Sequence, residues 1–176
     1  NFILNGTCSV PAVLNGWTLN KSSGNVTIEY VRLKNVTATG GATFTADNVT
    51  DFGGNNGWYL NYPTTKTFYW VNNGGNWTDA FHWSLTSGGT SAGCIPSPYD
   101  NVLFDANSFG GGGQIVTINQ EAYCKSMDWI AATKTPTLAG SSTIHIYGSL
   151  KLNSSMNITF TGGFYFESSD PGNTIT

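Results

Sequence analysis

The sequence has little charge. Only 10% of its 176 residues are Asp, Glu, Lys or Arg, and its seven basic residues are scattered between Lys21 and Lys151. No basic stripe is available to neutralise a phosphate backbone, so nucleic acid is excluded as a partner. No apolar run approaches the roughly 18 residues that span a bilayer, so we expect no membrane insertion in this segment.

Cysteine is also scarce. Cys8, Cys94 and Cys124 lack the CxxC spacing and the His partners of a zinc site. A bridge between Cys94 and Cys124 would close a loop of about 30 residues and stabilise the fold by about 3 to 4 kcal/mol. We predict this disulfide, with two buried free thiols as the alternative, and expect Cys8 to be unpaired or bonded to chain upstream. The disulfide implies an oxidising, extracellular location.

Turn-forming residues are abundant instead. Gly, Ser, Thr and Asn together make up about 45% of the chain, which favours turns and β-structure over helices. Hydrophobic residues make up 39% and aromatic residues 14%. That much apolar surface is too large to leave in water, so the chain is expected to fold.

Short runs of strand-forming residues recur between Gly, Asn, Ser and Pro clusters. The segment from Gln120 to Lys134 is open to a helical interpretation, but its apolar spacing favours strand plus turn. The expected strands are Asn25 to Leu33, Ala42 to Ala46, Trp58 to Tyr62, Phe68 to Val71, Asn101 to Phe104, Gln114 to Ile118, Thr143 to Leu152, Asn157 to Thr161 and Phe164 to Glu167.

The polar, proline-containing segment at residues 61–66 indicates a boundary, which gives one domain at 1–62 and a second at 67–176. In the second domain, short strands recur at intervals of roughly 14 to 18 residues. This predicts an all-β chain of stacked coils, a β-solenoid. Antiparallel β-sandwich modules stay open as the alternative. The last residues read as an unfinished strand, so we expect a fragment of a longer protein.

Two segments carry a resemblance to a known family. Residues 15–58, NGWTLNKSSGNVTIEYVRLKNVTATGGATFTADNVTDFGGNNGW, resemble the closing rungs of right-handed parallel β-helix regions in very large Bacteroidetes-type surface proteins, which implies that fold here. The segments FYWVNNGGNWTDAFHWS, from Phe68, and CIPSPYDNVLFDANSF, from Cys94, resemble a module repeated in those proteins, which include gliding-motility adhesins. Together these segments lie between residues 15 and 109 of the 176-residue chain.

The resemblance implies a function but no catalytic or binding residue. It implies export by a dedicated secretion route, a stalk-like position on the cell surface, and attachment to polysaccharide or a solid substratum. The implied partners are that surface, other modules of the same chain, and the secretion and anchoring machinery.

The acidic residues give little support to an enzyme. Glycosidases need two carboxylates roughly 5 to 10 Å apart. The only pairs close in sequence are Asp47 with Asp51 and Asp100 with Asp105, and both lie beside Gly or Asn corners where Asp ordinarily caps turns. Turn structure is therefore the favoured interpretation. Calcium stays open as an ion that these oxygens could bind, although no EF-hand pattern is present.

The two histidines are not arranged for catalysis. His82 and His145 are far apart in sequence and neither belongs to a triad pattern. His145 alternates with Ile144 and Ile146, which places it on the outward face of a strand. His82, between Phe81 and Trp83, is expected to be a packed or capping residue.

Aromatic residues are clustered around Phe68 to Trp83. We favour a core or junction role for them, because each large ring buries 150 to 250 Å². The alternative is a glycan platform, with Trp70, Trp77 and Trp83 as its binding residues, because aromatic faces stack on sugar rings.

The sequence thus predicts a structural and adhesive segment of an extracellular cell-surface protein and not an enzyme. A carbohydrate-binding module is the second hypothesis. A polysaccharide lyase or glycosidase is the third.

Overall fold

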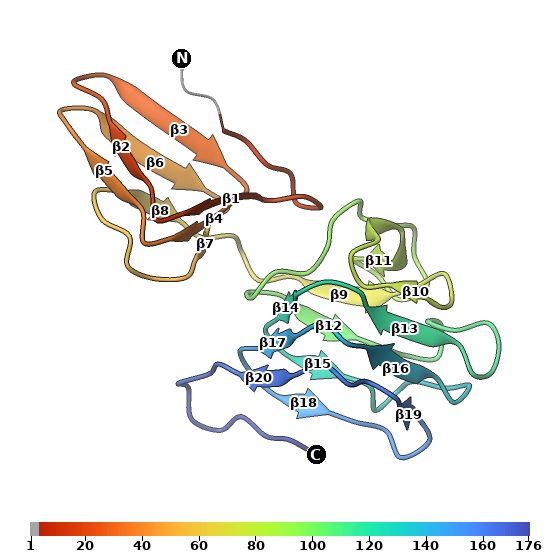
Figure 1. Cartoon of the computed structure of the whole chain (residues 1–176). Coiled ribbons are helices and arrows are strands. Elements are labelled where there is room, and N and C mark those ends of the chain that lie inside the picture. The colour runs from red at the N-terminus through yellow and green to blue at the C-terminus, as the bar shows by residue number, and fades with distance from the viewer. Residues whose placement is uncertain (1–3) are drawn as a thin grey trace. The chain divides into compact units, whose positions relative to one another are not determined.

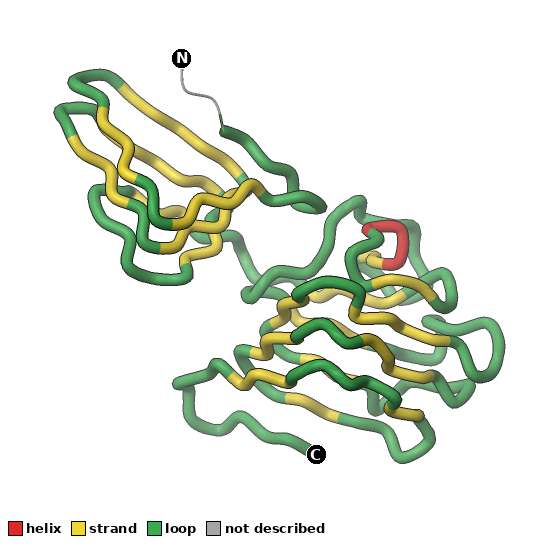
Figure 2. Tube along the Cα trace, in the orientation of Figure 1, coloured by secondary structure: helices red, strands yellow, loops and turns green. Residues whose placement is uncertain are grey.

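In the computed structural model, which describes residues 4–176, the chain is all-β and its strands stack in parallel as a β-solenoid, as predicted (Figures 1 and 2). The helical backbone in this range is one 3-10 turn, η1 (Ala80–His82). Within residues 4–176 no helix has the length and apolar character to cross a membrane. The chain divides into two compact units, Asn1–Thr64 and Thr65–Thr176.

The first unit has three sheets, β1-β4-β7, β2-β5 and β3-β6-β8, all paired in parallel. Ala12 pairs with Val31 and Arg32 with Thr50, 19 and 18 positions apart, whereas Thr45 pairs with Tyr59 only 14 positions apart, so the rungs take 14 to 19 residues. Its strands are β1 (Ala12–Asn15), β2 (Thr18–Asn20), β3 (Asn25–Glu29), β4 (Val31–Lys34), β5 (Thr37–Thr39), β6 (Thr43–Asp47), β7 (Thr50–Asp51) and β8 (Tyr59–Asn61).

The predicted single strand from Asn25 to Leu33 is wrong, because the chain turns a corner at Tyr30. Tyr30 has a φ of 49°, which no strand residue adopts. Before the corner Val26 and Ile28 face inward, and after it Val31 and Leu33 do. The buried positions therefore change from even to odd numbers at the corner, and all four side chains enter one core.

The second unit also has three parallel sheets, with one antiparallel pair, β9 with β11, at its start. Figure 1 shows the strands of each sheet lying side by side. They are β9 (Thr67–Trp70), β10 (Gly75–Asn76), β11 (Trp83–Ser84), β12 (Asn101–Leu103), β13 (Ile115–Ile118), β14 (Ala122–Cys124), β15 (Met127–Asp128), β16 (Thr137–Gly140), β17 (Ile144–Ile146), β18 (Leu150–Lys151), β19 (Asn157–Ile158) and β20 (Phe164–Phe166).

From β12 onward each rung places one strand on each of the three sheets. Parallel partners lie 20 to 25 positions apart, as Val102 with Met127 and Ile144 with Phe164 show. The interval of 14 to 18 residues inferred from the sequence was too short, because a full rung contains three strands and three corners. The predicted strand from Thr143 to Leu152 is two strands, β17 and β18, for the same reason. The segment from Gln120 to Lys134 is strand plus turn, as favoured.

The predicted disulfide between Cys94 and Cys124 is wrong. Cys124 is a free thiol with no exposed surface, inside the core of the second unit. Cys8 and Cys94 are both disulfide-bonded. Sequence spacing favoured Cys94 with Cys124, but β14 directs the Cys124 side chain into the apolar interior. Disulfide bonding is therefore present at Cys8 and Cys94 and not at Cys124, and the expectation that Cys8 is unpaired or bonded to chain upstream is wrong.

Candidate functional site

The outer face of strands β9, β12, β15 and β18, which are neighbours in one sheet, carries a hollow in the second unit. The inner face of this sheet is closed, because Phe68, Val102, Met127 and Leu150 form one buried row across the four strands. Side chains alternate between the faces of a strand, so the residues on either side of this row point outward. They line a trough of about 390 Å³.

Two outward rows line the trough. Each row has one residue for each of the four strands, which either belongs to the strand or directly precedes it. Strand register places these residues directly opposite one another on neighbouring rungs. The first row is Tyr69, Leu103, Asp128 and Lys151, and the second is Thr67, Asn101, Ser126 and Ser149.

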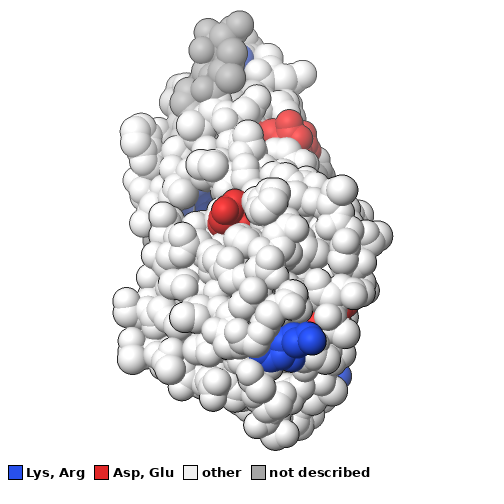
Figure 3. All heavy atoms as spheres, turned by 90° about the vertical axis from the view of Figure 1, so that its right-hand side faces the viewer, with Lys and Arg blue, Asp and Glu red and all other residues white. Residues whose placement is uncertain are grey.

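The trough offers hydrogen-bond donors and acceptors beside apolar surface. The Lys151 ammonium lies 3.4 Å from Asp128 Oδ2, while Asp128 Oδ1 accepts a hydrogen bond from the Ile130 N–H at 2.9 Å. Within residues 4–176, the polar side-chain atoms of Thr67, Tyr69 and Asn101 form no hydrogen bond. Charge is sparse on the molecule generally, and Figure 3 shows only small separate spots on one face. The trough is thus one of the few places where opposite charges meet.

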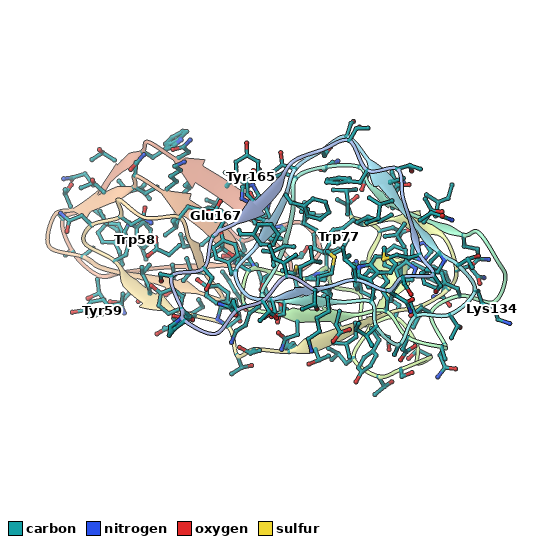
Figure 4. All side chains as sticks on the ribbon, turned by 90° about the horizontal axis from the view of Figure 1, so that it is seen from below. Trp58, Tyr59, Trp77, Lys134, Tyr165 and Glu167 are labelled. Carbon is teal, nitrogen blue, oxygen red and sulfur yellow. The ribbon has the colours of Figure 1, made fainter. Side chains whose placement is uncertain are left out.

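The three tryptophans predicted as glycan contacts are in the core instead. Trp70, Trp77 and Trp83 are at most 1% exposed, and Figure 4 shows Trp77 within the coils of the second unit. Trp83 packs edge-on against both other rings, with centroids 5.0 Å from Trp70 and 4.7 Å from Trp77. A ring enclosed on both faces cannot stack on a sugar, so the predicted glycan contact at these residues is wrong and the favoured core role is confirmed.

Another outward row, separate from the two rows of the trough, crosses the sheet β14-β17-β20. The His145 ring stacks between Tyr123 and Tyr165, with centroids 5.1 and 5.3 Å away. His145 Nε2 lies 3.0 Å from Glu121 and Nδ1 lies 2.9 Å from Glu167, so carboxylates from the rungs on either side meet one imidazole. A neutral imidazole has a single N–H, so only the imidazolium donates both bonds. The prediction that His145 faces outward is confirmed.

The same carboxylates act on a neighbouring phenol. The pKa of Tyr147 is raised from 10.0 to about 12, first by burial and then by the negative charge of Glu167, with Tyr99 and Glu121 adding to it. Anionic neighbours and burial both disfavour the phenolate. This face therefore holds tyrosine and glutamate side chains close together.

Three of the four paired aspartates cap turns, as favoured, whereas Asp47 bonds the residue opposite it on the neighbouring rung. Asp100 is buried, and its carboxylate accepts bonds from the backbone N–H groups of Lys66 and Ser97 and from the Ser97 hydroxyl. Asp105 accepts from the Asn107 N–H at 2.8 Å.

Asp51 likewise accepts from the Gly53 N–H and the Asn55 amide, and Asp47 from the Asn61 amide. In residues 4–176 no group of three or more His, Cys, Asp or Glu side chains is placed to hold a metal ion.

His82 is a packed residue, as expected. It is buried, stacks on Trp70 with ring centroids 4.7 Å apart, and bonds the Val71 carbonyl through Nδ1 at 2.9 Å. His82 therefore contributes to the buried packing at the start of the second unit.

Sequence reasoning missed the trough. Its residues come from four segments, and only the parallel register joins them. The available signal was the single polar or aromatic residue next to each buried one, such as Tyr69 beside Phe68 and Asp128 beside Met127.

No protein-family model, curated protein or solved structure matches this chain.

Proposed function

We propose that the chain is a structural and adhesive segment of an extracellular cell-surface protein, which attaches to polysaccharide or a solid surface. The observation that carries this proposal is the difference between the inward and the outward face of the strands in the second unit. Inward rows such as Phe68, Val102, Met127 and Leu150 are apolar and closed, whereas the outward rows are half-exposed hydroxyl, amide, aromatic and charged side chains.

Stacked parallel rungs suit such a segment. Each rung buries its apolar side chains against its neighbours, so the outward side chains form continuous rows without having to stabilise the fold. The first unit has the same arrangement, with a closed core and exposed Val13 and Tyr59 on its outer surface. The surfaces therefore serve contact with a partner.

The proposed role requires no turnover. The four aspartates of the two sequence pairs accept structural hydrogen bonds, three of them within turns and Asp47 from Asn61 on the neighbouring rung. Neighbouring modules of the same chain and a dedicated export route are part of the proposal, because the resemblance of residues 15–58 and of the segments from Phe68 and Cys94 implies them.

The test is retention of the folded chain on surfaces. The purified chain is applied to polysaccharide-coated and bare supports, beside the same chain unfolded in denaturant and a compact protein of similar net charge. Retention of the folded chain alone supports the proposal. Retention no greater than that of the control protein contradicts it, as would release of reducing ends or unsaturated products from a panel of neutral and acidic glycans.

A further inference from the structure

We propose that the trough on the sheet β9-β12-β15-β18 binds a neutral saccharide chain laid across the rungs. This inference rests on the proposed function and names the ligand of one surface within it. It places glycan contact at Tyr69, Asn101, Asp128 and Lys151, and away from the buried tryptophans.

One end of the trough is apolar enough to hold a sugar ring. Tyr69 and Leu103 are adjacent in the first row, on paired strands. Both are half-exposed because their inward neighbours, Phe68 and Val102, take the buried positions. Aromatic rings carry a large apolar face together with a polar tip, and this combination suits a ligand that has C–H faces and hydroxyl edges.

The other groups suit hydroxyls. Asn101 offers a carbonyl acceptor and an N–H₂ donor, and Thr67 offers a hydroxyl. Neither side chain has a hydrogen-bond partner within residues 4–176. Further along, Asp128 accepts and Lys151 donates, so a hydroxyl between them could do both. A few placed polar groups beside apolar surface are typical of small-molecule sites.

The charge balance favours a neutral ligand. Asp128 and Lys151 are 3.4 Å apart and cancel formally, and these are the only ionisable groups among the trough residues apart from the Tyr69 phenol. An acidic or basic chain would have to separate this pair to gain a partner, and would leave the other charge facing it. A neutral hydroxyl can bond either member with the pair intact.

The dimensions suit a chain of several sugar units. Neighbouring strands in a sheet lie about 4.8 Å apart, so the first row spans roughly 14 Å across four strands. The ligand is therefore expected to run perpendicular to the strands, with one set of contacts on each rung.

The experiment measures retardation of the folded chain in affinity gels that contain neutral or uronic-acid polysaccharides, followed by titration with the matching oligosaccharides. We expect binding to at least one neutral saccharide. Tyr69→Ala and Asn101→Ala should each weaken it about tenfold, as loss of a contact residue does. The matched control is Tyr165→Ala, on another sheet of the same unit; this tyrosine is 54% exposed.

Several results would overturn the proposal. They are the absence of binding to every neutral saccharide, tighter binding of the uronic-acid polysaccharides, and equal losses in Tyr69→Ala and Tyr165→Ala. Far-UV circular dichroism and the thermal midpoint of each variant show that the fold is retained. If Tyr69→Ala abolishes saccharide binding while surface retention persists, the trough proposal stands and adhesion uses another face. If retention occurs without any saccharide binding, the trough proposal fails and the adhesive function survives.

Discussion

Phe104 and Trp129 lie face to face on neighbouring rungs, with ring centroids 3.5 Å apart and planes 5° from parallel. Phe104 follows β12 and Trp129 follows β15, and both rings are at most 1% exposed. Phe109 lies beside this pair, with its centroid 6.4 Å from that of Phe104 and 6.3 Å from that of Trp129. Stacked aromatic rings thus continue from one rung to the next inside the second unit.

Replacing Trp129 by Ala should destabilise the second unit by about 3 to 5 kcal/mol, because it removes a buried ring and leaves a cavity beside Phe104. Denaturant unfolding followed by tryptophan fluorescence measures the change. The matched control is Phe81→Ala, since Phe81 is 60% exposed and its loss should change stability by no more than about 0.5 kcal/mol. Equal effects of the two substitutions would contradict the stacked core.

Gly57 and Gly53 should respond differently to alanine. Both have positive φ, 78° and 85°, so each substitution should cost about 1 to 2 kcal/mol of backbone strain. A Cβ at Gly57 would lie 2.2 Å from the Ala38 carbonyl oxygen, whereas a Cβ at Gly53 meets nothing within 4 Å. Gly57→Ala should therefore cost about 1 to 3 kcal/mol more than Gly53→Ala. Thermal unfolding of the first unit measures this, and indistinguishable variants would refute the close rung contact.

The Cys124 thiol should be inert in the folded chain. Burial raises its pKa, with a smaller contribution from the Asp100 charge, and the thiolate is the reactive form. We expect no alkylation under non-reducing native conditions and a single adduct, on Cys124, after unfolding, because Cys8 and Cys94 are disulfide-bonded. Mass spectrometry of the alkylated peptides measures this. An adduct on Cys94, or rapid labelling of the native chain, would contradict the structure.

Tyr147 should make the second unit lose stability in alkali. Its pKa is about 12 in the folded chain and 10.0 ordinarily, so above pH 10 the unfolded chain releases the phenolic proton first. The stabilisation is complete below pH 10.0 and is lost as the pH rises towards 12. Tyr147→Phe should lose less stability over this window than the parent chain. Denaturant unfolding at stepped pH tests this, and identical pH profiles would contradict it.

The sequence was sufficient for the class of fold and for the turn residues, but not for the rungs. Asp100 and Asp105 could be predicted as turn caps because their partners, Ser97 and Asn107, lie two or three residues away. The corner at Tyr30 was missed because the alternation of side chains between two faces, which starts at Val26, can be continued through Tyr30 without a visible break in the sequence. What marks that corner is the change of apolar phase between Ile28 and Val31.

The candidate site could not be derived because it depends on register. Tyr69 meets Leu103 34 positions later, and Leu103 meets Asp128 25 positions later, through strands of unequal spacing. The tryptophans were proposed as glycan contacts because composition does not show which side of a strand a ring occupies. Phe68 and Trp70 are two positions apart and lie on the same inward face of β9, so Tyr69 between them points outward.

The alternation of Tyr69 with Phe68 and Trp70 has an evolutionary consequence. Substitutions on the outward rows leave the inward side chains and their neighbouring rungs untouched, so the chemistry of the outer surface can change at almost no cost in foldability. Selection on the outer surface and selection on folding then act on different sets of positions, which interleave along every strand.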